Sequence, residues 1–506
     1  MRIMLALCLV LLIHRVPAAR AYDGISSLPF AHFLQSVRYN ENGEKVRVVF
    51  EFSDAIPEYH FSQTRNPSRI VLEFPQARAI EIDENIHKIA LSGIRVTMPS
   101  PELTRAVIDL AYPLPTASVF ALEDPPRIVV DIPKLYEEKS NIFVAPGIRY
   151  IQLERGMADG PLRVDVLDID LNDPTISVRP ALAGDRLSSR DTVSGISRRY
   201  GAIAAINGIY FAPDGRPLGL MVIDGYIVSG PLYRRSAFGI TSDRKVLIDR
   251  VDLQGRIILP GGREIKVSGV NSPRGTNDVI IYTSHWGDFT RTNGFGLEFS
   301  VVDNTVMEIG RGNLQIPRNG FVVSCHGNSV AELGDIAMGD QIHLDLRLDP
   351  DWISQGVIHA VGAGPRLVAS GVVTITSQEE LFKLDVTAGR APRTAIGVTA
   401  DNHLIMLVAT GRQQGISVGL GLDELARLMI EFGAVDAINL DGGGSSTLAI
   451  RGLVMNLPSE GRERKVGDAI LVFKNETLLP RAYDSLPVDT AEVEVTYNET
   501  DTHYGH

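Results

Sequence analysis

The sequence predicts an α+β domain with a mixed sheet at residues 147–475, preceded by a small all-β sandwich at residues 36–135. Short runs of alternating apolar and polar residues, such as 162–169, are typical of strands and fill the middle of the chain. Two helical patterns each stop at a glycine and lead into an apolar run, at 191–207 and 422–439. Strands mixed with a few helices predict the α+β class.

The first residues have the pattern of a signal peptide. Arg2 precedes an apolar run at residues 3–13, and Ala-Arg-Ala at 19–21 offers a small-x-small cleavage site. This run is too short to span a bilayer, and no later run is long enough. We therefore expect a signal peptide at residues 1–21, secretion across the inner membrane to the periplasm or beyond it, and no transmembrane segment after cleavage.

Charge and cysteine content exclude some classes of function. The formal charge is −12, from 61 acidic and 49 basic residues, so binding of nucleic acid or anionic lipid by bulk electrostatics is not expected. Cleavage of the signal would remove Cys8 and leave Cys325 alone, without an intramolecular disulfide. We expect Cys325 to be a small buried hydrophobe rather than a catalytic thiol.

The sandwich prediction depends on an internal repeat. Residues 47–75 align without gaps with residues 105–133, and each copy ends in a proline-bounded strand, Ile-Val-Leu-Glu-Phe-Pro or Ile-Val-Val-Asp-Ile-Pro. Repeats of this length are supersecondary units that pack against each other. Residues 136–146 are expected to be a linker, and residues 476–506 a disordered tail.

The most informative motif is Asn-Leu-Asp-Gly-Gly-Gly-Ser-Ser-Thr at 439–447, where an apolar run ends in a carboxylate and three glycines. Glycines permit close backbone approach and positive φ angles, and N–H groups exposed there can bind an anion. The alternative is a plain Asp-Gly turn with a flexible tip. On a strand, Asn439 and Asp441 point to one face and Asp436 to the other, so Asp436 is expected to be structural.

A second passage repeats the approach to this motif. Residues 200–207 match residues 432–439 as aromatic, Gly, Ala, aliphatic, any, Ala, Ile, Asn. Both copies follow a helical pattern and end in Asn. We therefore expect the two strands to lie side by side or nearly so, with Asn207 and Asn439 lining one cleft together with Asp441.

Eight ordered blocks resemble the phosphodiester glycosidase family over roughly residues 145–475. The blocks include Ala-Ile-Asn-Gly-Ile-Tyr-Phe at 205–211, Ser-Cys-His-Gly at 324–327, Arg-Thr-Ala-Ile-Gly at 393–397 and the glycine motif. The resemblance implies a hydrolase that cleaves a sugar from a sugar-1-phosphodiester in cell-envelope or extracellular polysaccharide. One departure is Thr410, where the family usually has Asp before Gly-Arg.

The duplicated region at 36–135 resembles the AMIN domain, a periplasmic module. That resemblance implies binding of peptidoglycan or another envelope glycan. The alternative is a structural appendage without a ligand.

The candidate catalytic residues are Asp441, Asn439, Asn207 and His326. Asp441 is the candidate nucleophile, base or charge stabiliser, and Asn207 would offer an amide to sugar hydroxyls. His326 could be a general acid or base, or a hydrogen-bonded structural histidine.

The candidate phosphate-binding groups are those around the glycine run: Gly442, Gly443, Gly444, Ser445, Ser446, and the guanidinium of Arg393 or Arg412. The alternative for each Arg is a structural ion pair. No Lys follows the glycines, so this is not a Walker-type nucleotide loop. No cluster has diagnostic metal-ligand spacing, and no cofactor is expected.

Two classes of function follow. The first is a secreted glycosidase that acts on phosphodiester-linked sugars and is targeted to the wall by its N-terminal domain. The second is a non-catalytic protein whose modules only bind envelope glycans. Thr410, in place of the usual Asp, favours this second class.

Overall fold

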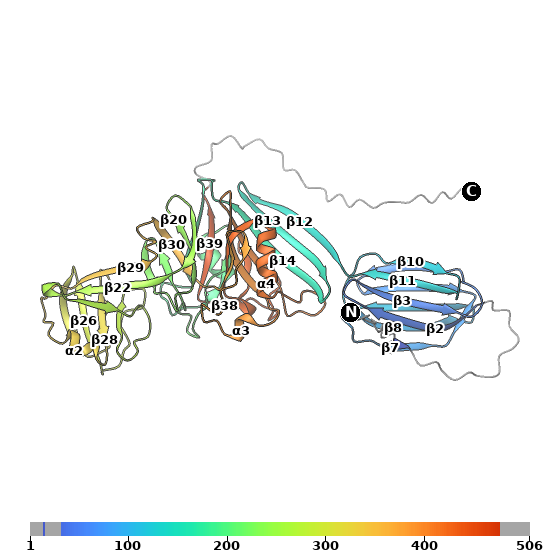
Figure 1. The fold of residues 1–506 in the computed structure, drawn as a ribbon, viewed down its shortest axis with the longest axis horizontal. Coiled ribbons are helices and arrows are strands. Elements are labelled where there is room, and N and C mark those ends of the chain that lie inside the picture. The colour runs from blue at the N-terminus through green and yellow to red at the C-terminus, as the bar shows by residue number, and fades with distance from the viewer. Residues whose placement is uncertain (1–13, 16–31, 476–506) are drawn as a thin grey trace, which may run out of the picture.

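The computed structural model describes residues 14–15 and 32–475, arranged as three parts in a row (Figure 1). An N-terminal sandwich is followed by a central body, residues 136–250 and 357–474, from which an outer lobe, residues 252–349, projects. The expected tail at 476–506, and the expected signal peptide apart from His14 and Arg15, lie outside the described residues.

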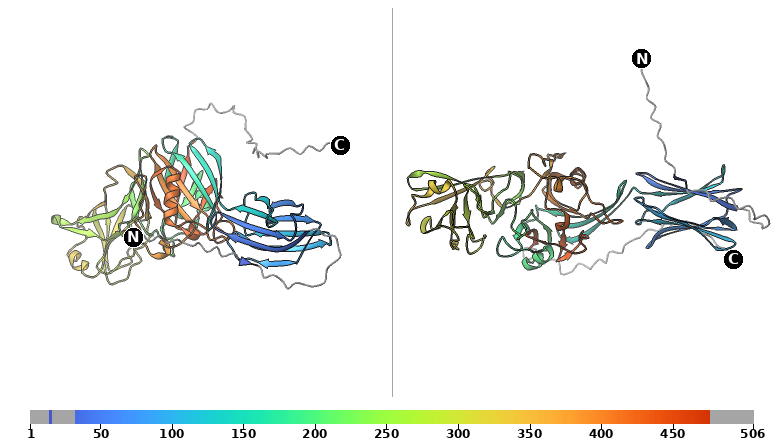
Figure 2. Two further views of the ribbon diagram at one scale, coloured as in Figure 1. Left: turned by 45° about the vertical axis from the view of Figure 1, so that its right-hand side comes forward. Right: turned by 90° about the horizontal axis from the view of Figure 1, so that it is seen from below.

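The sandwich consists of two facing sheets, antiparallel apart from the pair β2 and β6, and is seen edge-on in Figure 2. Its strands are β1 (His14–Arg15), β2 (His32–Glu41), β3 (Lys45–Phe52), β4 (His60–Arg65), β5 (Ser68–Pro75), β6 (Ala77–Ala79), β7 (Ile82–Asn85), β8 (Leu91–Ser100), β9 (Leu103–Leu110), β10 (Ser118–Leu122) and β11 (Arg127–Pro133). The two sequence copies interleave, because β3 of the first copy pairs with β11 of the second, and β5 pairs with β9. Alternate residues of β3, from Val46 to Phe52, fill the core between the sheets.

The central body contains an eight-stranded sheet in the order β12-β13-β14-β34-β33-β35-β31-β32. Its strands are β12 (Tyr136–Ala145), β13 (Ile148–Met157), β14 (Gly160–Asp170), β31 (Arg366–Ala369), β32 (Val372–Val373), β33 (Arg393–Thr399), β34 (His403–Ala409) and β35 (Ala434–Asn439). The segment expected to be a linker is therefore β12, an edge strand of this sheet.

A five-stranded sheet, in the order β15-β39-β17-β36-β37, packs against the eight-stranded one through a shared apolar core. Its strands are β15 (Ile176–Leu182), β17 (Ala204–Asn207), β36 (Leu448–Ile450), β37 (Leu453–Val454) and β39 (Asp468–Lys474), and the short β16 (Asp191–Thr192) pairs with β38 (Lys465–Val466) beside it. A third sheet leads to the outer lobe and contains β18 (Met221–Ile223), β19 (Tyr226–Ser229), β20 (Ser236–Thr241), β21 (Val246–Arg250) and β30 (Val357–Gly362).

The outer lobe is an insertion between β21 and β30. It contains β22 (Asp252–Ile258), β23 (Glu264–Val267), β24 (Gly269–Val270), β25 (Val279–Tyr282), β26 (Leu297–Val302), β27 (Thr305–Gly310), β28 (Gly320–Cys325) and β29 (His343–Asp349). The strands β22 and β29 carry the chain out and back.

The predicted α+β class with a mixed sheet is wrong, because the described residues are mostly β-strand. Their four α-helices are short: α1 (Val193–Tyr200), α2 (Ser329–Leu333), α3 (Leu384–Thr387) and α4 (Leu422–Glu431). Every pairing of neighbouring strands in the eight-stranded sheet is antiparallel. A helix, a glycine and a strand do follow one another up to β35, as the sequence predicts. The strand β35, however, pairs with antiparallel partners rather than joining a parallel crossover sheet.

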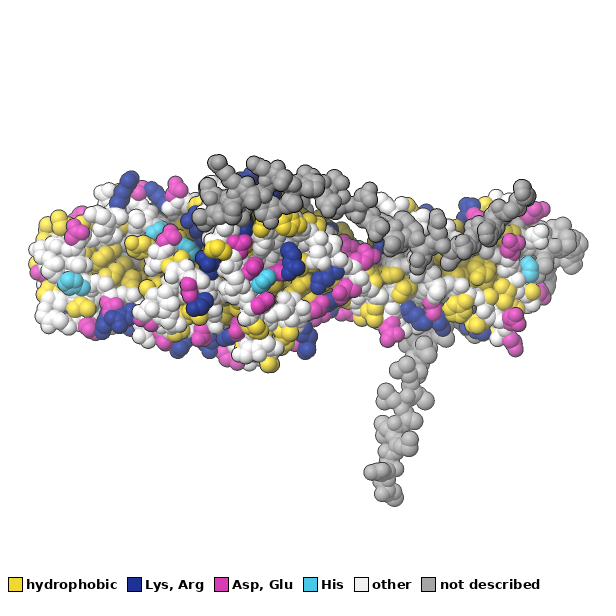
Figure 3. All heavy atoms as spheres, turned by 90° about the horizontal axis from the view of Figure 1, so that it is seen from above, with side chains coloured by type: hydrophobic (Ala, Val, Ile, Leu, Met, Phe, Trp, Pro, Cys, Tyr) yellow, Lys and Arg dark blue, Asp and Glu magenta, His cyan; other side chains and the backbone are white. Residues whose placement is uncertain are grey.

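No helix within residues 14–15 and 32–475 is long and apolar enough to cross a bilayer. On the face drawn in Figure 3, acidic and basic side chains intermingle over the central body instead of forming one broad basic surface.

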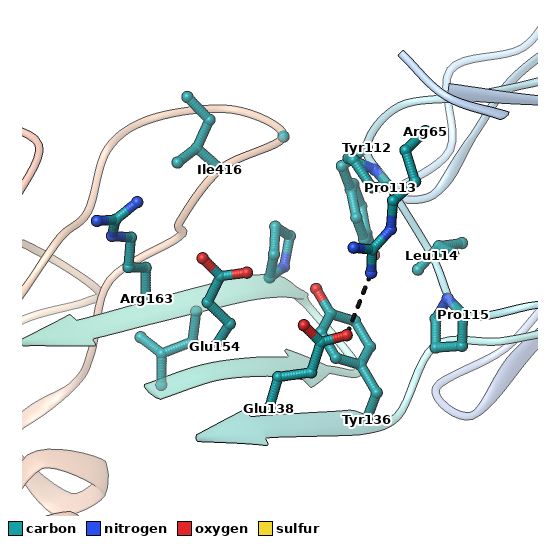
Figure 4. Close-up of a pocket in the computed structure, with 13 residues that line it drawn as sticks. Arg65, Tyr112, Pro113, Leu114, Pro115, Tyr136, Glu138, Glu154, Arg163 and Ile416 are labelled. Carbon is teal, nitrogen blue, oxygen red and sulfur yellow. Dashed lines mark hydrogen bonds and ion pairs between the residues drawn. The ribbon is translucent and has the colours of Figure 1, made fainter. Parts of the chain in front are cut away.

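A buried ion pair fastens the sandwich to the central body. Lys134 Nζ donates to Glu41 Oε1 at 2.8 Å, to the carbonyl of Asn42 at 2.9 Å, and to the carbonyl of Ala158 in the β13–β14 turn at 2.8 Å. An exposed pair, Arg65 with Glu138 at 3.1 Å, crosses a crevice of about 260 Å³ between the same two parts (Figure 4).

We expect Lys134→Met to lower the free energy of unfolding by about 3 kcal/mol or more, because it leaves the Glu41 carboxylate buried without its cation. The matched change Arg65→Met breaks only an exposed ion pair and should cost less than about 1 kcal/mol. Urea unfolding of both variants measures the difference, and equal losses would contradict the buried anchor.

Candidate active site at the glycine turn

The ends of three strands meet at the glycine motif. Asn207 ends β17, Asn439 ends β35, and Asp468 begins β39. The strands β17 and β35 belong to different sheets, so they do not lie side by side as hydrogen-bonded neighbours. Their ends nevertheless converge, because the Asn207 side-chain amide donates to the carbonyl of Asp441 at 2.7 Å.

Asn207 ties the site together and is almost fully buried. Its Oδ1 accepts hydrogen bonds from Thr394 Oγ1 at 2.8 Å and from the Thr447 amide at 3.1 Å. The amide that was expected to contact a sugar is therefore used to hold the glycine turn against β17 and β33.

Asn439 is also buried, and its two polar side-chain atoms differ in their hydrogen bonding. Its Nδ2 donates to Tyr210 Oη at 2.9 Å and to the carbonyl of Leu440 at 2.7 Å. Its Oδ1 has no hydrogen-bond partner among the described residues.

Asp441 lies half-buried at the start of the turn. Burial raises the pKa of its carboxyl to about 6, against the opposing effects of the nearby Ser445 hydroxyl and the positive charge of Arg464. The Ser445 hydroxyl lies near this carboxyl but has no hydrogen-bond partner among the described residues. Asp441 is thus mostly ionised at pH 7 and close to its titration range.

Asp468 is a second carboxyl at this site, and the sequence reasoning missed it. The residue is 1 % exposed, and its Oδ1 accepts a hydrogen bond from the Ile209 amide at 3.0 Å. Burial, and to a lesser degree the charge of Asp441, raise the pKa of Asp468 to about 8. A Cβ at Gly208 would lie 1.8 Å from Asp468 Oδ1, so only glycine fits beside it.

Several buried polar atoms here lack a partner among the described residues: Asn439 Oδ1, Ser445 Oγ, Ser446 Oγ, Thr447 Oγ1 and Asp468 Oδ2. Buried polar groups in native proteins are almost always hydrogen-bonded, so such a concentration is unusual. The atoms come from the two strand ends and the turn between them. All of them are shielded from solvent, so the turn and the strand ends beside it hold several unsatisfied donors and acceptors close together.

The three glycines meet different surroundings, and the firmest constraints are the positive φ of Gly443 and the backbone contact of Gly442. Gly443 has a φ of 63°, and the turn Gly443–Ser445 is a single 3₁₀ turn. A Cβ at Gly442 would lie 2.9 Å from the carbonyl of Pro392, and one at Gly444 would lie 2.2 Å from Arg464 Nη2. The motif is a close-packed turn rather than a flexible tip.

The two candidate arginines differ. Arg393 is buried, and its guanidinium donates to three carbonyls: Leu420 at 3.0 Å, Val386 at 2.7 Å and Gly389 at 3.2 Å. Burial lowers its pKa. These contacts make Arg393 a structural tie between loops, through carbonyls rather than through the ion pair given as its alternative.

Arg412 is exposed and forms no hydrogen bond or ion pair with the residues that the structure describes. A Cβ at Gly443 would lie 3.4 Å from Arg412 Nη1, so the guanidinium lies over the glycine turn. Its own φ of 58° is rare for a residue with a side chain. Arg464, paired with Glu460, flanks the same turn.

The structure does not bring His326 to this site. His326 follows β28 in the outer lobe, far from β39 in Figure 1. The preceding Cys325 is fully buried, and burial raises the pKa of its thiol to about 11. Thr410, at the position of the family Asp, is buried, and its Oγ1 accepts a hydrogen bond from the Leu457 amide.

Residues 295–473 match the phosphodiester glycosidase family. The matched segment contains both carboxyls, Asp441 and Asp468, the glycine turn and both candidate arginines, whereas Asn207 lies outside it. No group of three or more His, Cys, Asp or Glu residues in the described chain could hold a metal ion.

Two relatives match parts of this chain. The SPbeta prophage-derived uncharacterized protein YomE of Bacillus subtilis is 37% identical over 120 residues, which are 24% of this chain and 18% of that protein. The mouse N-acetylglucosamine-1-phosphodiester alpha-N-acetylglucosaminidase is 40% identical over 68 residues, which are 13% of each chain. The chain thus matches less than a fifth of either relative.

Two crystal structures share the fold. A hypothetical protein from Synechocystis aligns over 91% of this chain and 83% of its own, with a TM-score of 0.62 and 24% identity. A putative exported protein from Burkholderia pseudomallei aligns over 67% of this chain and 97% of its own, with a TM-score of 0.58 and 22% identity.

Proposed function

We propose that this protein hydrolyses the bond between the anomeric carbon of a sugar and the phosphate of a phosphodiester. The observation that carries the proposal is the pair Asp441 and Asp468, two carboxyls with pKa values raised to different extents, beside a glycine turn overlain by the unpaired Arg412. Two carboxyls in different protonation states are what glycoside hydrolysis uses.

Each carboxyl has a role that its environment supports. Asp468 keeps its proton at neutral pH and, through its unpartnered Oδ2, can donate a hydrogen bond or a proton. Asp441 is the anion that attacks the anomeric carbon, activates water, or stabilises the positive charge of an oxocarbenium-like transition state. The C1–O bond breaks with its electrons going to the phosphate oxygen, and water supplies the new hydroxyl on C1.

The leaving phosphate is placed at the glycine turn. Its negative charge can be held by the guanidinium of Arg412, whose planar donors match phosphate oxygens, whereas the amides of Gly443, Ser445 and Ser446 already donate to protein carbonyls. The hydroxyls of Ser445 and Ser446 are available for the same ligand.

We expect Arg412→Gln to raise KM about tenfold with little change in unfolding, because Arg412 has no protein partner to lose. Arg393→Gln should instead lower the free energy of unfolding by about 3 kcal/mol, since it removes the guanidinium that donates to three carbonyls. Steady-state kinetics and urea unfolding on both variants measure the two effects. A stable Arg393→Gln protein with the larger KM would reverse the assignment.

The substrate class that we propose is a sugar-1-phosphodiester in cell-envelope or extracellular polysaccharide. Support comes from the family match and from the mouse relative, whose name specifies an N-acetylglucosamine 1-phosphodiester. The signal-like N-terminus supports secretion to the periplasm or beyond it.

We further propose that the sandwich binds peptidoglycan or another envelope glycan. A groove of about 360 Å³ on one of its sheets, lined among others by Arg38, Asn40, Arg47 and Arg127, supports this role. The test is sedimentation of the full chain with isolated peptidoglycan. If the protein stays in the supernatant with every envelope glycan, this proposal is wrong and the sandwich is a structural appendage.

The test of the catalytic proposal is incubation of the purified full chain with a panel of sugar-1-phosphodiesters, with Asp441→Asn as the control. Release of free sugar by the parent protein and not by the variant is the expected result.

A further inference from the structure

A second pocket, of about 330 Å³, lies between the central body and the outer lobe. One wall is the loop after β17, which contributes Asp214 and Arg216. The opposite wall is the segment after β25 in the outer lobe, which contributes Trp286, Arg291 and Thr292. None of these residues belongs to the site at the glycine turn.

The pocket has a fixed aromatic side. The rings of Tyr282 and Trp286 lie with their centroids 5.0 Å apart, and Trp286 Nε1 donates to the carbonyl of Thr290 at 3.0 Å. The guanidinium of Arg216 lies 5.4 Å from the Trp286 ring centroid and is itself held by Asp214 at 2.8 Å. Aromatic rings beside hydrogen-bonding groups are typical of sites that bind amphipathic rings such as sugars.

The base of the pocket is rigid. The fully buried Glu298 accepts hydrogen bonds from Thr290 Oγ1 at 2.9 Å, Thr292 Oγ1 at 2.7 Å, the Leu314 amide at 2.9 Å and Ser324 Oγ at 2.7 Å. Arg274 lies 3.8 Å from the same carboxylate, and its Nη2 donates to Asn293. A site that is already ordered loses little conformational entropy when a ligand binds.

The pocket has an excess of positive charge at its rim. Arg291 is exposed, has a φ of 54°, and forms no hydrogen bond or ion pair within the described chain. Arg216 and Arg274 line the same space, whereas Asp214 is the one acidic residue of its lining. An anionic group is therefore the ligand that this rim favours.

The pocket adjoins the carboxyl site. A Cβ at Gly467 would lie 2.1 Å from the carbonyl oxygen of Gly215, which stands between Asp214 and Arg216. Gly467 directly precedes Asp468. The loop that forms one wall of the pocket thus packs on the strand start that carries the buried carboxyl.

We propose that this pocket binds a phosphate- or carboxylate-bearing sugar of the same glycan that is cut at Asp441, so that the enzyme holds a polymer at two points. The inference rests on the proposed function for the identity of the glycan. The sugar ring packs on the Trp286 side, and its anionic group meets Arg291. This makes the natural substrate an anionic polymer, of which a small sugar-1-phosphodiester represents the part that is cut at Asp441.

Tryptophan fluorescence tests the pocket directly, because the chain has two tryptophans and the other, Trp352, is 1 % exposed in an apolar core. Phosphorylated, uronate-containing and neutral oligosaccharides are titrated into full-length Asp441→Asn protein. We expect saturable quenching by an anionic glycan and none by the neutral one, and the two anionic arms identify the group. Arg291→Gln should weaken binding about tenfold.

The matched control is Arg318→Gln, an exposed arginine of the outer lobe that does not line the pocket. No quenching by either anionic glycan, or equal weakening by Arg291→Gln and Arg318→Gln, would overturn the inference while leaving hydrolysis of small phosphodiesters untouched. Quenching with no hydrolysis of any substrate by the parent protein would instead contradict the proposed function and leave the pocket in place.

Discussion

Asp441→Asn is expected to slow hydrolysis of a sugar-1-phosphodiester by about a hundredfold or more. The amide keeps the size of the side chain but cannot carry the negative charge that a nucleophile, base or charge stabiliser needs. Folding should be retained, because burial of the charged form is a cost to the native state, as its raised pKa indicates. Steady-state kinetics with thermal unfolding as a check measure both.

Asp436→Asn is the matched control for this change. Asp436 lies on the same strand, β35, and pairs with Arg366 away from the glycine turn. Its substitution should leave turnover unchanged. A folded Asp441→Asn protein with undiminished turnover would remove Asp441 from the mechanism.

The second large effect is expected at Asp468. With Asp441 needed as an anion and Asp468 as an acid, kcat/KM should rise through about pH 6 and fall through about pH 8. Because the two carboxyls interact, the two apparent pKa values of this profile belong to the pair rather than to either residue alone. Asp468→Asn should lower the rate by about a hundredfold and remove the alkaline limb, because the amide cannot lose a proton.

Stability against pH provides an independent check on Asp468. Its folded pKa is raised above the unfolded value, so the folded state holds the proton more tightly, and stability falls as pH rises toward about 8. The Asp468→Asn protein should lose less stability over that range. An unchanged alkaline limb together with an unchanged pH dependence of unfolding would show that Asp468 does not titrate there.

The sequence predicted the glycine turn and Asp441 as the candidate site, because an apolar run that ends in a carboxylate and three glycines is an unusual pattern, and the catalytic role of Asp441 stays a prediction. The sequence was not enough for Asp468, since Gly-Asp-Ala-Ile reads as an ordinary strand start. The available signal was an acidic residue at the first position of a strand whose next five residues are apolar. Only the folded chain places it against Gly208.

The other errors have physical causes as well. Helix-glycine-strand periodicity is local, so it cannot distinguish the antiparallel partners of β35 from parallel ones. His326 appeared in an ordered set of motifs, but order along the chain gives no distance in space. Arg393 and Arg412 look alike in sequence, and only the three carbonyls around Arg393 separate a structural guanidinium from a free one.

The central claim is tested most directly by product analysis with the full-length protein and a sugar-1-phosphodiester panel at about pH 7, between the two carboxyl pKa values. The account predicts that at least one substrate yields free sugar and phosphomonoester in equal amounts, and that Asp441→Asn and Asp468→Asn each suppress both products. A folded parent protein that binds these phosphodiesters and leaves every one of them intact would contradict it, and would favour a protein that only binds envelope glycans.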